Sequence, residues 1–333
     1  MFKLPAETAH DITIRQLELL QNSYMGRELI KLLSGHVESN PVQVMGLNFR
    51  HPVGLAAGLD KDAKVIRGLF QMGFSHIEVG TLTPKGQPGN DKPRLFRLKE
   101  DDALINRMGF NNEGSIAASR RLKKRDPNWG VVGGNVGRNK ITNNENAIDD
   151  YIASMSHLRD HVDYFTVNIS SPNTPGLREL QQEEVLKNLL TRISDDNSKS
   201  FKPRPLAVKI SPDLSKQEVQ SISRLAVTCG FNGIIGTNTT VNRTGLKTKA
   251  NRIEDAGLGG LSGRPLARHS TDVVTWIKEA VGDSAAVIGV GGVFNAQDVI
   301  DKRNAGADLV QIYSGFVYNG PSMLNNIQEA WIK

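Results

Sequence analysis

The chain has 333 residues, of which 38% are apolar and 23% charged, and its formal net charge is +6, a balance typical of a globular protein with a sizeable core. Its single cysteine, Cys229, excludes an internal disulfide and a cysteine-ligated zinc or iron–sulfur centre. No stretch reaches the roughly 18 apolar residues of a membrane-spanning helix, and the N-terminus lacks a signal-peptide pattern, so we expect a cytoplasm-like compartment.

The start of the chain predicts a helical segment ahead of the main fold. Residues 5–34 have the apolar spacing of one or two amphipathic helices. The side chains that mark their apolar faces are Ile14, Leu17, Leu20, Leu29, Ile30 and Leu33. Val42–Val44 and Leu47–Phe49 then flank Met45-Gly46 and predict a small hairpin that closes the bottom of the following fold.

From Val53 onward, short apolar runs alternate with longer amphipathic segments. The eight runs are Val53–Ala57, His76–Val79, Val131–Gly134, Tyr164–Val167, Leu206–Ile210, Gly233–Ile235, Ala286–Val290 and Leu309–Tyr313. Near-continuous Val, Ile and Leu content is typical of buried parallel strands. Segments with helical length and spacing include Leu180–Ser194, Lys216–Cys229 and Thr271–Val281. Eight such units predict a single (β/α)₈ TIM barrel with a short N-terminal helical extension.

Two connections, Thr81–Asn128 and Asn238–Ser270, are too long for simple crossovers and predict covers or binding loops. The first contains a dense basic stretch, Arg120–Arg125. A solvated helix face is its simplest interpretation, and contact with anionic lipid is the alternative. Because the stretch has no interleaved aromatic residues, we expect no nucleic acid partner. Cys229 lies in an apolar run and is expected to be a buried structural thiol.

The active site of a TIM barrel lies at the carboxyl ends of its strands. The residues predicted there are Asp60, Lys61, Thr81, Asn135, Asn168, Lys209, Thr237, Asn238, Gly291, Gly292, Tyr313 and Ser314. Two lysines among amides and hydroxyls favour a planar polar ligand with an anionic group. The lack of a carboxylate pair and of a histidine cluster argues against glycoside hydrolysis and zinc hydrolysis, and we predict no metal site.

Two further segments predict specific contacts with a ligand. Gly289–Val293 and Gln311–Gly315 follow the seventh and eighth strands, where barrels commonly bind a phosphate with backbone N–H groups and a short helix. The segment Asn168–Arg178 is a turn on composition alone. Its position after the fourth strand, however, brings two serines and two asparagines to the cavity.

Together these residues resemble the class 2, quinone-dependent dihydroorotate dehydrogenase family, from about His10 to the end of the chain. The motifs that carry the resemblance are Ala56–Lys61, Asn106–Phe110, Asn168–Leu177, Thr237–Thr240, Gly260–Leu266 and Ile312–Gly315. Class 1 relatives have a cysteine where this chain has Ser171, which favours class 2.

The resemblance implies oxidation of dihydroorotate to orotate in pyrimidine biosynthesis, with FMN as hydride acceptor and a membrane quinone as electron acceptor. The residues implied to hold FMN are Ala57, Gly58, Thr81, Asn135, Asn168, Lys209, Thr237, Gly263, Gly292, Tyr313 and Ser314. Those implied to hold dihydroorotate are Lys61, Asn106, Arg107, Met108, Gly109, Phe110, Asn168, Asn173, Asn238 and Thr239. Ser171 is implied as the catalytic base, with a proton route through Thr174 and a water near Phe110.

The resemblance also implies a division of the chain. Residues 1–40 form the segment that faces the quinone and the membrane, and residues 41–333 form the FMN-binding barrel. His10 and Arg97 match the histidine and arginine that the family has near its quinone tunnel. The implied location is peripheral, on the cytoplasmic side of the cell membrane. The first helix looks shortened ahead of His10, which leaves the depth of membrane insertion open.

Two other functions share parts of the pattern. A dihydropyrimidine or dihydrouridine reductase would share the flavin barrel, but such relatives favour a cysteine acid, and those acting on RNA a basic partner domain. A non-catalytic barrel attached to membranes by its first helices would share the N-terminal segment but would bind no flavin.

Overall fold

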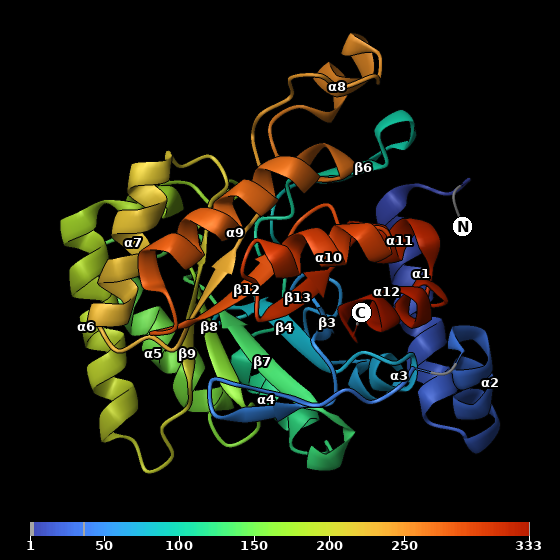
Figure 1. Ribbon diagram of the computed structural model, residues 1–333, viewed down its shortest axis with the longest axis horizontal. Coiled ribbons are helices and arrows are strands. Elements are labelled where there is room, and N and C mark those ends of the chain that lie inside the picture. Colours follow the sequence, from blue (N-terminus) through green and yellow to red (C-terminus); the bar gives the residue numbers. More distant parts are fainter. Residues whose placement is uncertain (1–2, 36, 333) are drawn as a thin grey trace.

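The computed structural model describes residues 3–35 and 37–332 (Figure 1). Eight parallel strands close into a barrel in the order β3-β4-β7-β8-β9-β10-β12-β13. Their bounds are β3 Val53–Leu55, β4 His76–Leu82, β7 Val131–Val136, β8 Tyr164–Asn168, β9 Leu206–Ile210, β10 Gly233–Gly236, β12 Ala286–Val290 and β13 Leu309–Ile312. Each predicted apolar run overlaps one of them, so the predicted TIM barrel is confirmed. The strand β4 is longer than predicted and continues past an irregularity between Val79 and Leu82.

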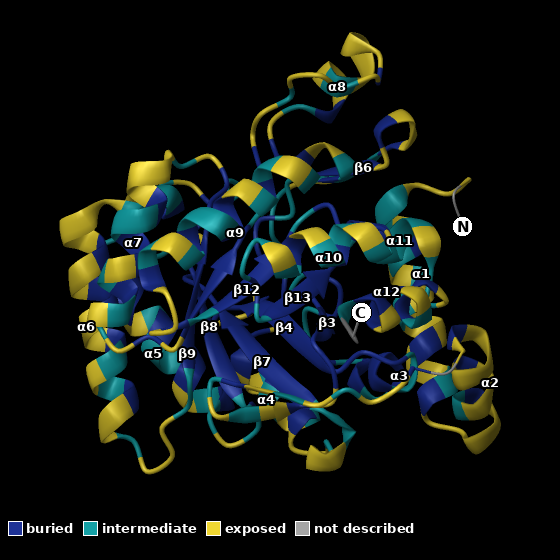
Figure 2. Ribbon diagram, viewed as in Figure 1, coloured by how far each residue is buried: buried dark blue, intermediate teal, exposed yellow. Residues whose placement is uncertain are grey.

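Helices surround the barrel, with exposed outer faces and buried inner faces (Figure 2). Those that follow the strands are α3 Ile66–Gln71, α4 Ser115–Leu122, α5 Ala147–Leu158, α6 Glu183–Lys199, α7 Lys216–Thr228, α9 Ala267–Val281, α10 Ala296–Asn304, α11 Ser314–Asn319 and α12 Met323–Ile332. The sequence specifies some of their ends. Ser215 and Glu218 form a capping box that satisfies backbone N–H groups at the start of α7.

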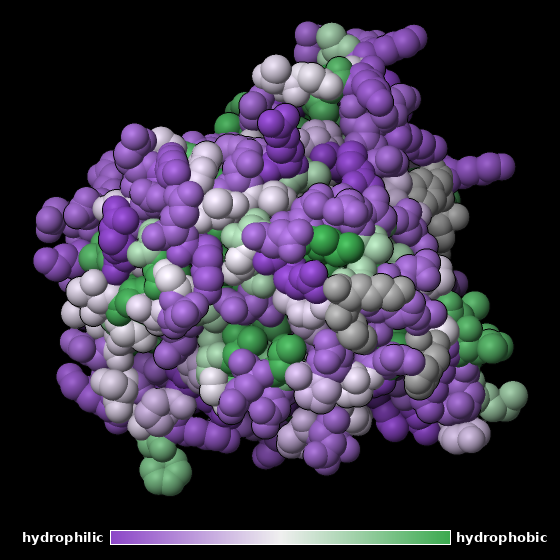
Figure 3. Space-filling model, viewed as in Figure 1, coloured by the Kyte–Doolittle hydropathy of each residue, from purple (hydrophilic) through white to green (hydrophobic). Residues whose placement is uncertain are grey.

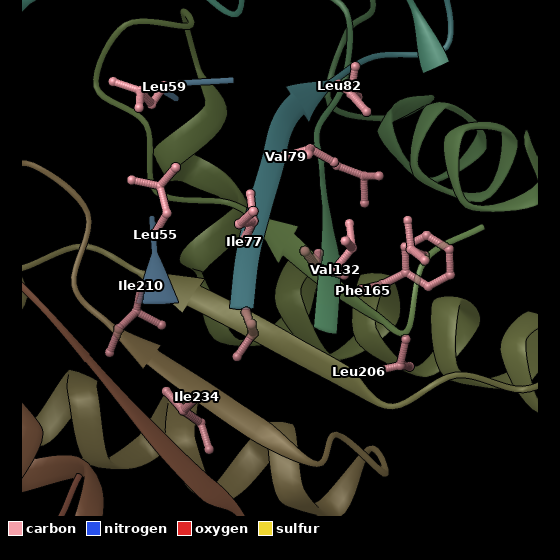
Figure 4. Close-up of a cluster of buried hydrophobic side chains, with 14 of the residues drawn as sticks. Leu55, Leu59, Ile77, Val79, Leu82, Val132, Phe165, Leu206, Ile210 and Ile234 are labelled. Carbon is pink, nitrogen blue, oxygen red and sulfur yellow. The ribbon is translucent and has the colours of Figure 1, made fainter. Parts of the chain in front are cut away.

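Side chains along each strand alternate between two environments, because successive residues of a strand point to opposite faces. Ile77, Val132 and Phe165 belong to the large core between the strands and the helices (Figure 4). Val131 and Tyr164, one position before Val132 and Phe165, belong to a smaller cluster inside the barrel. Polar residues at inward positions near the carboxyl ends of the strands can therefore meet inside the barrel.

The two long connections contain a sheet that sequence analysis missed. The strands β5 (Leu95–Leu98), β6 (Ala103–Asn106) and β11 (Gly260–Gly263) form an antiparallel sheet in the order β11-β6-β5. The second connection also contains the helix α8 (Ala250–Ala256). The expectation of two separate loops was thus incomplete: Leu98, Ile105 and Leu261 make a small core of their own.

The N-terminal segment folds as two helices, α1 (Ala6–Gln21) and α2 (Tyr24–Ser34). The side chain of Gln21 ties α1 to α3, donating to Lys64 O at 2.7 Å and accepting from Gly68 N at 3.0 Å. Leu17 and Ile30 are buried, but Leu29 and Leu33 are exposed. The predicted apolar face of α2 therefore packs only partly on the protein.

The predicted hairpin forms from β1 (Val42–Val44) and β2 (Leu47–Phe49). Both turn residues, Met45 and Gly46, have positive φ, as a tight two-residue hairpin turn requires. Val44 and Phe49 pack in the cluster inside the barrel, so the hairpin closes the end opposite the predicted site.

Three smaller expectations can be compared with the structure. Within the predicted basic stretch, Arg121 pairs with Glu113 and Arg125 with Asp163, while Lys123 and Lys124 are exposed. Cys229 is half-buried rather than buried, because it lies at the C-terminal cap of α7. In the described part of the chain, no helix has both the length and the apolar character needed to cross a bilayer.

Candidate active site

One cavity opens at the carboxyl ends of the barrel strands. The predicted site residues that line it are His10, Ala57, Gly58, Lys61, Thr81, Asn106, Met108, Gly109, Phe110, Asn168, Ser171, Asn173, Lys209, Thr237, Asn238, Thr239, Gly263, Gly291, Gly292, Tyr313 and Ser314. They come from segments throughout the chain. The closed barrel explains why they meet, because all of its parallel strands end on the same face.

Besides Asp60 and Thr174, which are described below, three predicted site residues do not line the cavity. Asn135 is buried inside the barrel and reaches the site through its neighbours. The guanidinium of Arg107 donates to Pro93 O at 2.9 Å and to Ala256 O at 3.0 Å, which joins the antiparallel sheet to α8. Arg97 lies on β5 and donates to Leu4 O, which fastens the start of the chain to this sheet.

Sequence analysis missed several residues of the cavity wall. Leu95 and Leu104 belong to no predicted motif, and the other residues lie within predicted motifs or segments but were given no contact of their own: Ala56, Ser262, Leu266, Val290, Val293 and Gln311. Leu95 and Leu104 belong to the antiparallel sheet, which was not predicted. Gln311 occupies an inward position of β13, and the two-residue repeat of the strand could have identified it.

Glycines keep the backbone close to the cavity at two places. Gly58 has φ of +112°, and a β-carbon there would lie 3.2 Å from the ring of Tyr313. Gly292 has φ of +71°, and a β-carbon there would lie 2.2 Å from the α-carbon of Ala267. The turn after β12 therefore requires glycine. It lies beside the first residue of α11, where backbone N–H groups have no intrahelical partners and can bind an anion.

Two lysines supply positive charge to the cavity. Among the described residues, the side-chain amine of neither Lys61 nor Lys209 makes a hydrogen bond or an ion pair. Burial lowers the pKa of both amines, while Asp62 acts on Lys61 and Glu78 on Lys209 in the opposite direction. Two cations without a protein partner in one cavity favour an anionic ligand.

A hydrogen-bond network joins the polar residues at the bottom of the cavity. Asn168 donates to Thr81 Oγ1 at 2.9 Å and to Asn135 Oδ1 at 3.3 Å. Its own side-chain oxygen accepts from Asn238 Nδ2 at 3.3 Å. Each amide is held in one orientation, so the cavity presents fixed donors and acceptors to a ligand.

Ser171 lies in the loop after β8 and is 6% exposed. Its hydroxyl oxygen accepts from Asn173 N at 3.3 Å, and the described part of the chain places no base beside it. The hydroxyl of Thr174, three residues on, is buried and has no partner among the described residues. The loop thus carries two hydroxyl groups that remain available to a ligand or to water.

His10, on α1, lines the cavity, and the buried Asp60 immediately precedes Lys61. Burial, together with the nearby Lys61, lowers the pKa of His10 to about 3, so the imidazole is neutral at pH 7. Asp60 accepts from Lys64 N and Val65 N, each at 2.8 Å, which fixes the turn that carries Lys61. Burial raises the pKa of Asp60 to about 6, although these two backbone hydrogen bonds act to lower it.

The comparisons with known proteins agree on one family. Residues 40–332 match the family model described as dihydroorotate dehydrogenase. A relative from Christiangramia forsetii, named dihydroorotate dehydrogenase (quinone), is 51% identical over 86% of this chain and 83% of its own. A relative of the same name from Shewanella denitrificans is 45% identical over 99% of this chain and 96% of its own.

Solved structures give the same result. The ligand-free DHODH from Eimeria tenella has 35% identity and a TM-score of 0.83, over 92% of this chain and 93% of its own. The same enzyme in complex with ferulenol has 34% identity and a TM-score of 0.81, over 93% of this chain and 90% of its own.

Proposed function

The chain belongs to the dihydroorotate dehydrogenase family and oxidises dihydroorotate to orotate in pyrimidine biosynthesis, with a quinone as electron acceptor, and we propose how its cavity does so. The observation that carries the proposal is the pair of lysines, Lys61 and Lys209, which face the same cavity as Ser171 without a protein partner. Dihydroorotate carries a carboxylate, and a flavin mononucleotide carries a phosphate and becomes more negative when it is reduced.

The cofactor in this proposal is FMN. The glycine turn at Gly292 and the start of α11 at Ser314 suit its single phosphate. Gln311, which lines the cavity, has a buried side-chain oxygen without a partner among the described residues, as expected where a ligand N–H binds. When bound, the isoalloxazine ring supplies the hydride acceptor that no side chain can provide. A cofactor released by heat should have the mass of FMN; FAD, or no cofactor, would contradict the assignment.

The cofactor and substrate contacts follow the family motifs. FMN is held by Ala57, Gly58, Thr81, Asn168, Lys209, Thr237, Gly263, Gly292, Tyr313 and Ser314, and Asn135 acts through Asn168. Dihydroorotate is held by Lys61, Asn106, Asn173, Asn238 and Thr239, beside the backbone from Met108 to Phe110. Arg107 keeps a structural function in this proposal, because its guanidinium binds backbone carbonyls outside the cavity.

Ser171 acts as the base that removes the proton from C5 of dihydroorotate. A serine hydroxyl is a weak base and needs a route that takes its proton onward. The partnerless hydroxyl of Thr174 suits that route. Lys61 pairs with the substrate carboxylate, and Lys209 stabilises the negative charge that develops at the edge of the flavin.

Electrons leave towards the N-terminal helices, and His10 and Arg97 mark the polar end of the quinone path. His10 lines the cavity, and Arg97 donates a hydrogen bond to Leu4 O, just ahead of α1. Exposed apolar side chains gather where α2 lies (Figure 3). They are Leu19, Tyr24, Met25, Leu29, Leu32 and Leu33, and we call them the apolar patch. Residues 1–40 are thus the segment that contacts the membrane surface, on the cytoplasmic side, and residues 41–333 are the FMN-binding barrel.

A comparison of electron acceptors tests the proposed quinone path. Orotate formation should be fastest with ubiquinone and negligible with NAD or fumarate. An enzyme that prefers NAD or fumarate would contradict the assignment of the N-terminal helices, although not the dihydroorotate site.

A further inference from the structure

A buried carboxylate lies inside the barrel, next to the cavity but not in its wall. Glu78, on β4, is fully buried. Its two oxygens accept four hydrogen bonds from side chains, and the donors are Asn135 Nδ2 at 2.6 Å, Tyr164 OH at 3.2 Å, Thr166 Oγ1 at 3.0 Å and Gln311 Nε2 at 3.0 Å. Four donors facing two oxygens suit an ionised carboxylate, which can only accept.

Glu78 decides which way the amide of Asn135 points. Since the Asn135 NH₂ group binds the carboxylate, its oxygen faces the opposite way, where it accepts from Thr81 Oγ1 at 2.6 Å and from Asn168 Nδ2 at 3.3 Å. Asn168 is thereby fixed with its own oxygen towards Asn238 Nδ2. One carboxylate thus sets the polarity of two amides in series, and the second amide lines the cavity.

Glu78 fixes Gln311 in the same way. The Gln311 NH₂ group donates to Glu78 and, at 3.3 Å, to Tyr164 OH. Its oxygen is therefore the free end of a side chain that lines the cavity, and among the described residues this buried oxygen has no donor. A buried acceptor without a partner costs about 1–3 kcal/mol, which a donor on a bound ligand would recover.

We propose that Glu78 is a positioning residue of the cofactor site, which turns the amides of Asn135 and Gln311 so that Gln311 Oε1 accepts a hydrogen bond from an N–H group of the bound flavin. The inference rests on the proposed flavin site. If Glu78 only stabilised the barrel, the orientation of these two amides would not affect cofactor binding.

The test is the FMN dissociation constant, measured from the flavin fluorescence that appears when the full-length holoprotein is diluted. Glu78→Gln offers one oxygen and one NH₂ group, so it cannot accept from both amides, and one of them must turn. FMN should dissociate with a constant roughly tenfold or more above that of the unchanged protein, because a buried hydrogen bond is lost. The double variant Glu78→Gln/Gln311→Glu should recover most of this loss, because it restores one acceptor towards the cavity and one bond between positions 78 and 311.

Thr166→Val is the matched control, since it removes one donor to Glu78 but leaves both amides in place. Its FMN dissociation constant should stay within about twofold of the unchanged protein.

The inference is overturned if Thr166→Val weakens FMN binding as much as Glu78→Gln, if Glu78→Gln binds FMN normally, or if the double variant binds FMN no better than Glu78→Gln alone. Should Glu78→Gln fail to fold, Gln311→Met removes the same acceptor, and normal FMN binding by that variant overturns the inference. An unchanged protein that binds no FMN would instead contradict the proposed function.

Discussion

The side-chain amide of Asn173 donates a hydrogen bond of 3.0 Å to the side-chain oxygen of Asn106. This bond joins the loop after β8 to the end of β6, and Asn90 Nδ2 reinforces it by donating to Asn173 O at 3.1 Å. The loop that carries Ser171 is therefore held against the antiparallel sheet, across the cavity from the barrel. A substrate bound in the cavity would contact both this loop and the barrel.

Replacement of Ser171 tests its role as the base. Ser171→Ala should lower the rate of flavin reduction by dihydroorotate by roughly 10²–10⁴-fold, because it removes the proton acceptor while leaving the FMN contacts in place. Ser171→Cys should retain more activity than the alanine variant, since a thiol can still accept the proton. Anaerobic stopped-flow absorbance would measure both rates. An alanine variant of normal rate would transfer the role to Ser170 or to water.

The turn at Gly292 can be tested against a glycine of similar backbone conformation. Gly292→Ala and Gly245→Ala both place alanine at positive φ, +71° and +78°, which costs each about 1–2 kcal/mol of stability. Only at Gly292 does the new β-carbon meet the backbone of Ala267; at Gly245 nothing lies within 4 Å. FMN binding should weaken roughly tenfold or more in Gly292→Ala only, because contacts to a charged group are lost. Equal FMN affinity in both variants, measured by fluorescence, would contradict a phosphate site at this turn.

The site and the fold differ in how far the sequence predicts them. The eight barrel strands were predictable because each is a short, nearly continuous apolar run. The sheet of β5, β6 and β11 was not, because β6 pairs with a strand more than 150 positions away, as at Asn106 and Gly260. Residues at or after the end of a strand were found, but Glu78, in the middle of β4, was not, and Gln311 was named only as part of the predicted phosphate segment. The alternation that turns Tyr164 inward and Phe165 outward would have marked them as inward positions.

Buried histidines should make the protein sensitive to acid. Burial lowers the pKa of His10 to about 3, of His51 to about 4 and of His76 to about 3. A histidine whose pKa is lowered in the folded state does not reduce the free energy of unfolding above its unfolded pKa of about 6.5. As pH falls from there towards the folded pKa, the free energy of unfolding decreases by up to about 1.4 kcal/mol per pH unit for each group. Asp60, whose pKa is raised to about 6, has the opposite effect, because it increases the free energy of unfolding as pH falls below about 6.

His76→Phe isolates one of these groups. Both ring nitrogens of His76 are buried without partners among the described residues, and the ring packs edge-on against Phe49 at 5.2 Å. Phenylalanine has a similar shape but cannot be protonated. Urea denaturation between pH 7 and pH 5 should give a smaller loss of unfolding free energy in the variant. The same loss in both proteins would mean that His76 is not neutral in the folded state.

The α2 side chains of the apolar patch can be tested separately from the chemistry of the cavity. Leu32 and Leu33 are 79% and 59% exposed, and Phe201, outside the N-terminal helices, is fully exposed. Leu32→Glu/Leu33→Glu should reduce vesicle binding and turnover with vesicle-bound ubiquinone roughly tenfold or more, because each buried leucine contributes about 1.5–3 kcal/mol. Reduction of the flavin by dihydroorotate should not change. Phe201→Glu should change neither vesicle binding, nor turnover with vesicle-bound ubiquinone, nor flavin reduction. Equal effects of both variants on vesicle binding would contradict a membrane-facing α2.

Anaerobic addition of dihydroorotate to the purified, full-length protein tests the assigned cavity most directly. Residues such as Lys61, Lys209 and Ser171 that line one cavity predict a flavin absorption band that disappears as dihydroorotate is added, with one orotate formed for each flavin reduced. Addition of ubiquinone should then restore the band. A flavin band that persists in excess dihydroorotate, or a protein without such a band, would contradict the assignment of this cavity.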